Sequence, residues 1–95
     1  MTPHQLKLAR HALGLPNDQM RSYRNRYIAV PGTREYGSWE EMVAAGEAVK
    51  TSGDEMGLGK NDHFRLRHAA AKAALEPGER LDMEDFPSGA DFIEA

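Results

Sequence analysis

The small size of the chain is the feature that most restricts its fold. Its 95 residues leave room for one hydrophobic core and none for a second. A domain of this size buries only about 60–65% of the surface that its unfolded chain exposes, so its stability is modest. The chain has no cysteine, so there is no disulfide framework and no thiolate for a zinc site. We therefore predict one domain over residues 1–87, followed by a frayed acidic tail over residues 88–95.

Several absences in the sequence predict where the protein works. No apolar run approaches the roughly 20 residues of a membrane span. The first five residues lack the apolar core of a signal peptide. Together with the absence of cysteine, this predicts a cytoplasmic protein that contacts no membrane.

The charges are segregated along the chain, although the formal net charge is only -3. The net charge is +4 over residues 1–35, -3 over 36–60, +2 over 61–75 and -6 over 76–95. A basic first third and an acidic end indicate either two partner surfaces or an attraction within the chain that docks the tail.

The first predicted element is a helix. Thr2 and Gln5 form a Thr-x-x-Gln capping box, which marks its start. Gly14 and Pro16 mark its end. The apolar stripe of this helix consists of Leu6, Leu8, Ala9, Ala12 and Leu13, and its basic, outward-projecting face of His4, Lys7, Arg10 and His11.

A strand and a second helix are predicted next. Residues 22–30 have the aromatic and β-branched content of a strand, which ends at Pro31-Gly32. Apolar residues occupy both the odd-numbered and the even-numbered positions of this strand, which point to opposite faces of a sheet. We therefore expect a bulge in the strand or burial of both its faces. Ser38 and Glu41 form a second capping box, which predicts a helix from Ser38 to Gly46. Its core-facing stripe consists of Trp39, Met42, Val43 and Gly46.

The second half of the chain is predicted to form a hairpin and a third helix. A short strand over 47–50 precedes a polar, glycine-containing loop over 51–62, which we interpret as a mobile hairpin arm. In the return strand over 63–67, Phe64 and Leu66 point one way and Arg65 and Arg67 the other. An alanine-rich helix follows from His68 to Glu76, and Leu81 and Phe86 anchor the acidic remainder. The prediction is an α+β domain in the order helix, strand, helix, two strands, helix, with a small antiparallel sheet.

Patterns for nucleotide or metal binding are incomplete. Gly59-Lys60 resembles the end of a Walker motif, but Asp54 stands where that motif needs glycine and Asn61 where it needs serine or threonine. The four histidines have no spacing typical of a metal site. The acidic run 82–85 lacks the glycine and final glutamate of an EF-hand loop. We predict no cofactor, no metal and no small-molecule substrate.

The sequence also lacks a pattern typical of catalysis. Glu40 and Glu41 are adjacent on a predicted helix, so they point in different directions. The chain has four serines, and none of them has a neighbouring histidine in a known nucleophile motif. They are Ser22, Ser38, Ser52 and Ser88. We therefore expect a protein that is not an enzyme.

Bases and aromatic residues alternate in one segment, and two further arginines lie on the return strand. Arginine forms bidentate phosphate contacts and tyrosine offers a stacking face, which indicates a nucleic-acid surface. The alternative, which the acidic pI of about 5.8 favours, is that these arginines pair with Glu40, Glu41, Glu47 or the acidic tail. The candidate contact residues, for nucleic acid or another partner, are Arg21, Tyr23, Arg24, Arg26, Tyr27, Arg65 and Arg67.

Motifs along most of the chain carry a family resemblance. They comprise residues 2–17, 21–27, 42–46, 62–66, 77–79 and 85–87, together with Trp39. By these motifs, the chain resembles a family of small uncharacterised proteins encoded in tailed bacteriophages and proteobacterial prophages. The resemblance implies a phage or prophage origin, and it carries no assigned activity.

A second resemblance concerns the half of the chain that begins at Ser38. Its order of helix, short strand, glycine loop, strand and helix is similar to the helix-plus-wing segment of winged-helix proteins. Arg67 and Ala70 stand where that pattern usually has threonine and glycine. The strand over 27–30 replaces the helix that precedes the second helix of a helix-turn-helix.

These observations predict a non-catalytic interaction module of phage type that binds another protein, whose identity they leave open. The alternative is a winged-helix-like nucleic-acid-binding protein. It would use Arg21, Arg24, Arg26, Arg65 and Arg67, with Lys7 and Arg10.

Overall fold

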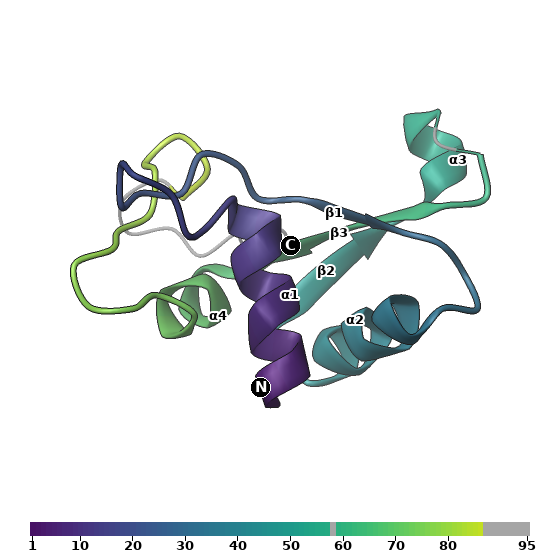
Figure 1. Cartoon of the computed structure of the whole chain (residues 1–95). Coiled ribbons are helices and arrows are strands. Elements are labelled where there is room, and N and C mark those ends of the chain that lie inside the picture. Colours follow the sequence, from purple (N-terminus) through teal and green to yellow (C-terminus); the bar gives the residue numbers. More distant parts are fainter. Residues whose placement is uncertain (58, 87–95) are drawn as a thin grey trace.

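Helices and strands alternate along the chain in the order that the sequence predicts, with one additional helical turn between the last two strands. A computed structural model describes residues 1–57 and 59–86 (Figure 1). The predicted tail over 88–95 lies outside these residues. The elements are α1 (Pro3–Leu13), β1 (Tyr27–Ala29), α2 (Arg34–Ala44), β2 (Ala48–Thr51), α3 (Gly53–Met56), β3 (Asp62–Leu66) and α4 (His68–Ala73).

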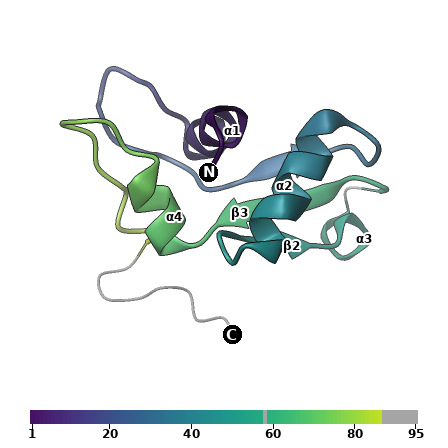
Figure 2. The ribbon, with the colours of Figure 1, turned by 90° about the horizontal axis from the view of Figure 1, so that it is seen from below.

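The three strands form an antiparallel sheet in the order β1-β3-β2, which confirms the predicted α+β class. Tyr27 lies opposite Phe64 on the β1 side, and Ala48 lies opposite Leu66 on the β2 side. α2 lies below the sheet in Figure 1, and Figure 2, seen from below, shows α2 over the sheet and α1 beside β1. None of the helices in the described ranges is long and apolar enough to cross a membrane.

The core lies between this covered face of the sheet and the helices. Phe64 and Leu66 are fully buried, so the predicted alternation of β3 is confirmed. The Trp39 ring stacks on the Phe64 ring at a centroid distance of 5.6 Å, which joins α2 to β3. Leu81 packs against the core and Phe86 is buried, as predicted for the anchors of the C-terminal segment.

The ends of α1 and α2 follow local capping rules, with one correction. Both hydrogen bonds of the Thr2–Gln5 capping box are present, as predicted. The prediction that α2 begins at Ser38 is wrong, because Thr33 caps it one turn earlier by accepting a hydrogen bond from the Tyr36 amide. Gly46 follows α2 with a φ of 78°, which suits the predicted stop.

The predicted outward face of α1 also needs correction. Arg10 is only 9% exposed, because it reaches the C-terminal segment and forms an ion pair with Glu79. It also donates a hydrogen bond of 2.9 Å to the carbonyl of Ala74. Leu6, which the periodicity places on the apolar stripe, is 37% exposed. Arg10 is thus buried at a position that the periodicity assigns to solvent, whereas Leu6 is exposed at a position that it assigns to the core.

The predicted strand over 22–30 is paired in the sheet only over Tyr27–Ala29. Asn25 explains the shortening, because its side chain donates to the carbonyl of Leu66 and accepts from the amide of Leu66, both at 2.9 Å. A side chain therefore replaces the backbone as the partner of β3 at this position. One face of the strand is buried and the other is exposed, since Ala29 is buried, whereas Ile28 and Val30 are exposed.

The predicted hairpin loop over 51–62 contains the helical turn α3. The Asp62 carboxylate accepts hydrogen bonds from the Gly53 amide and the Tyr36 hydroxyl, so it ties this turn to α2. A Cβ atom at Gly53 would lie 1.4 Å from the carbonyl oxygen of Asn61, so the close approach requires glycine. The third predicted helix ends at Ala73 and not at Glu76.

Candidate binding surface

The basic segment over 21–27 runs from the end of α1 to β1. Two backbone hydrogen bonds hold it on the last turn of α1, from the Tyr23 amide to the Leu13 carbonyl and from the Arg26 amide to the Ala12 carbonyl. The Tyr23 ring lies against Gly14, where a Cβ atom would be 2.2 Å from it, so this position of the ring requires glycine. These hydrogen bonds fix the backbone of the segment at the surface, beside the end of α1.

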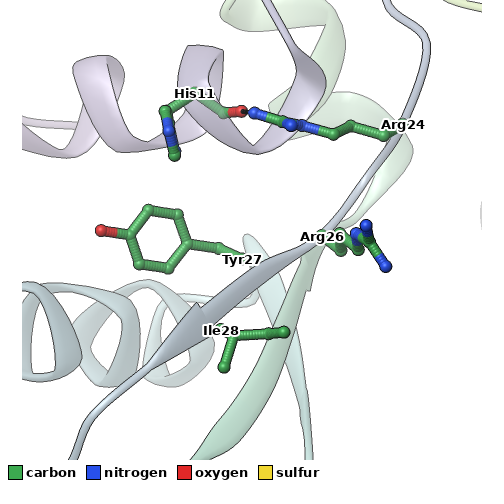
Figure 3. A pocket seen from close by; sticks show the side chains of 5 residues that line it. All are labelled: His11, Arg24, Arg26, Tyr27 and Ile28. Atoms are coloured by element: carbon green, nitrogen blue, oxygen red, sulfur yellow. Dashed lines mark hydrogen bonds between the residues drawn. The ribbon is translucent and has the colours of Figure 1, made fainter.

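Arg24 and Tyr23 form a pair on this surface. The guanidinium group of Arg24 donates a 2.6 Å hydrogen bond to the carbonyl of His11, at the carboxyl end of α1 (Figure 3). The same group lies 5.2 Å from the centroid of the Tyr23 ring, a cation–π distance. Tyr23 is nevertheless 60% exposed. Arg24 thus stabilises the helix end and keeps its charge at the surface.

Tyr27 does not offer the free stacking face that the sequence predicts. Its ring lies 5.3 Å from that of His11 and 5.5 Å from that of Trp39. Burial, with a contribution from Glu35, raises the pKa of its hydroxyl group. Tyr27 therefore belongs to the edge of the core and forms one wall of the surface.

Arg26 and Arg65 share the face of the sheet opposite the helices. Tyr27 and Phe64 pair on the covered face, so alternation places Arg26 and Arg65 one position further along on the other face. His63 lies on this outer face too, opposite Ile28. Burial and the charges of Arg65 and Arg26 lower the pKa of His63. The outer face is therefore electropositive near Arg26.

Arg21 and Arg67 lie at other positions. Arg21 pairs with Arg80 in an isolated bridge and lines a cavity of about 410 Å³ that also contains Asp18 and Asp82. Arg67 precedes α4, and its amide donates to the carbonyl of Glu47. The structure thus gathers Arg24, Arg26 and Tyr27 around one cavity but places Arg21 at another.

The acidic residues expected to neutralise the arginines have other partners. Glu40 pairs with Lys50, Glu41 accepts a hydrogen bond from Gln5, and Glu47 lies 3.8 Å from the amino terminus. Glu76 and Glu79 pair with Arg10. Among the described residues, the alternative that Arg21, Arg24, Arg26 and Arg67 pair with Glu40, Glu41 or Glu47 is therefore wrong, and the tail over 88–95, the other partner considered, lies outside these residues. Within residues 1–57 and 59–86, no ion pair involves Arg21, Arg24, Arg26 or Arg67.

A cavity of about 300 Å³ lies between the end of α1 and the outer edge of β1. Figure 3 shows the Tyr27 ring on one side of the strand and the side chains of Arg26 and Ile28 on the other. We call this surface the basic edge, and its residues are His11, Arg24, Arg26, Tyr27 and Ile28. Sequence reasoning missed His11 and Ile28, because neither residue type signals a site until the packing of α1 on β1 is known.

Comparisons with known proteins leave the basic edge to be interpreted from its geometry. No family model matches the chain, and no curated protein or solved structure shows significant similarity to it. Within the described part of the chain, no group of three or more acidic or histidine side chains is placed to hold a metal ion.

Proposed function

We propose that this protein is a non-catalytic interaction module that binds an acidic segment of another protein through the basic edge. The observation that carries the proposal is the pair Arg24 and Arg26, which faces a cavity without a carboxylate partner among the described residues. Exposed apolar surface adjoins these charges, since Ile28 is 43% and Val30 53% exposed. A polypeptide that carries both carboxylates and apolar side chains would complement this combination of positive charge and apolar surface.

Nucleic acid is the alternative partner, and unpaired arginines also suit phosphate. Two features favour protein. The exposed side of α2, which a winged-helix protein would present to DNA, carries Glu40 and Glu41 and therefore repels phosphate. Tyr27 packs against His11 and Trp39, so of the two tyrosines in the segment over 21–27 only Tyr23 is free to stack on a base. A phage or prophage origin stays a prediction and adds no activity to this proposal.

A binding assay with a designed peptide tests the proposal. The probe is a fluorescein-labelled peptide of about ten residues, a length sufficient for a strand. Pairs of glutamates alternate with pairs of valines in it, so that an extended peptide carries carboxylates on both of its faces. We expect saturable binding that increases the fluorescence anisotropy. A peptide with lysine in place of glutamate should not bind, because it is repelled by Arg24 and Arg26.

Two charge-reversal variants locate the binding. Arg26→Glu should weaken binding of the acidic peptide by about tenfold or more, because it places a carboxylate beside the ligand. Lys72→Glu is the matched control: it changes the net charge equally at an exposed position on α4, and binding should change less than about twofold. Equal losses in the two variants, or no binding by the unmodified protein, would contradict the proposal. Tight, steeply salt-dependent binding of random-sequence DNA would favour nucleic acid instead.

A further inference from the structure

β1 lies at an edge of the sheet, and its hydrogen-bonding groups alternate between the two sides. Among the described residues, the sheet order β1-β3-β2 leaves one side of β1 without a neighbouring strand. The Arg26 amide points to this side, because it donates to the Ala12 carbonyl in α1. Since backbone groups alternate along a strand, the amide and carbonyl groups of Tyr27 face β3 and those of Ile28 face outwards. Ile28 therefore presents a donor and an acceptor at the free edge.

These two groups of Ile28 have no partner among the described residues. No backbone or side-chain hydrogen bond reaches the amide or the carbonyl group of Ile28. The open edge is short and bounded. It begins where the Arg26 amide bonds to α1 and ends where the Val30 carbonyl accepts hydrogen bonds from Thr33. Edge strands with unpaired backbone groups are templates for the addition of another strand.

The charges around the edge select among the strands that would fit it. Residues 19–33 contain three arginines and no acidic residue, so two copies of this edge repel each other. Arg24 lies on the side of α1, and Arg26 lies on the outer face of the sheet. An added strand therefore meets a cation on each of its two faces. The complementary occupant is an extended segment that carries carboxylates, with apolar residues to cover Ile28 and Val30.

We propose that an acidic, extended segment of a partner protein adds to β1 as a further strand of the sheet, through hydrogen bonds to the amide and carbonyl groups of Ile28. This inference rests on the proposed function and adds the binding mode to it. The basic side chains give the preference for acidic sequences, while the backbone of Ile28 fixes the extended conformation and the register.

A backbone variant tests this mode. Ile28→Pro removes the outward amide, which forms no hydrogen bond among the described residues, and proline is tolerated on edge strands. Ile28→Ala is the matched control, since it also loses the isoleucine side chain but keeps the amide. With the glutamate–valine peptide as probe, we expect Ile28→Pro to bind about tenfold more weakly than Ile28→Ala. Equal affinities of these two variants would overturn strand addition.

Two measurements keep the test independent of the stability of the proline variant. In the unmodified protein, hydrogen exchange at the Ile28 amide should become at least about tenfold slower when the peptide saturates the site. Two further peptides are N-methylated at alternate residues, one at the odd positions and the other at the even positions. The peptide whose methylated amides face β1 should not bind, because that edge of the added strand then lacks donors, whereas the other peptide should still bind. Unchanged exchange at Ile28 together with tolerance of both methylation patterns would contradict the proposed mode.

The outcomes separate the two proposals. Binding that Arg26→Glu weakens and Ile28→Pro does not would retain the acidic partner and reject strand addition. If the unmodified protein binds DNA but not the glutamate–valine peptide, both proposals are rejected.

Discussion

His63 reports the electrostatic field of the outer face of the sheet at the scale of a single residue. Burial and the positive charges of Arg65 and Arg26 lower its pKa. We predict that Arg26→Gln raises the pKa of His63 towards the ordinary value of 6.5, as measured by NMR titration of the imidazole protons. Lys72→Gln serves as the control and should leave that pKa unchanged. An unchanged pKa in Arg26→Gln would show that Arg26 does not act on this face.

Glu79 supplies a second residue-scale prediction, for stability against acid. Its hydrogen bonds to Arg10, opposed by burial, lower its pKa from 4.5 to about 2. Because the folded protein lowers this pKa, the ion pair stabilises the fold above pH 4.5, and this stabilisation disappears as the pH falls towards 2. Glu79→Gln should reduce the free energy of unfolding at neutral pH by roughly 3 kcal/mol, since the buried Arg10 then keeps only the exposed carboxylate of Glu76, 3.8 Å away, as a counter-charge.

Denaturant unfolding at a series of pH values checks this. Between pH 5 and 2, the stability of Glu79→Gln should depend less on pH than that of the unmodified protein. Parallel curves for the two proteins would contradict the role of Glu79. Glu84→Gln is the control, since Glu84 is exposed and forms no ion pair among the described residues.

At the scale of elements, Asn25 decides where the sheet begins. Its side chain occupies both the amide and the carbonyl group of the buried Leu66. Asn25→Ala leaves both groups without a partner, and we expect the free energy of unfolding to fall by about 2 kcal/mol. Chemical denaturation measures this change. A loss below about 0.5 kcal/mol would indicate that the strand extends through residue 25 and replaces these bonds.

The elements that depend on neighbouring residues are those that the sequence predicts well. The capping box at Thr2 and the alternation at Phe64 and Leu66 are local patterns, and both are confirmed. The predicted start of α2 is wrong because Thr33 and Ser38 can each cap a helix. Tyr36 explains the choice, since its ring packs on Phe64 and its hydroxyl donates to Asp62, so the extra turn gains tertiary contacts.

Long-range partners are the part that local patterns do not contain. Arg10 has the spacing of a solvent-exposed helix residue, and its burial follows from Glu79, which lies 69 positions away. The same limit applies to the candidate site. The sequence indicates a basic and aromatic segment over 21–27, but it does not indicate that Tyr27 would pack inwards, nor that β1 would lie at an edge. Sheet order determines whether Ile28 is available for binding.

At the scale of the whole molecule, a negative net charge coexists with a positively charged binding surface. The chain carries -3 overall, yet Glu40 pairs with Lys50 and Glu79 with Arg10, and no described carboxylate forms an ion pair with Arg24 or Arg26. The protein should therefore associate with acidic polypeptides in spite of its own net charge. Added salt should weaken this association moderately, because the contact also buries apolar surface.

An amide-shift titration of isotopically labelled protein tests this central claim most directly. The ligands are the glutamate–valine peptide and, separately, short random duplex and single-stranded DNA, at low and at moderate salt. We predict saturable shifts with the peptide that cluster over residues 24–30 and at His11, and weak shifts with DNA. Salt-sensitive shifts with DNA at residues 21–27 and 65–67, without a response to the peptide, would contradict the account and identify a nucleic-acid-binding protein.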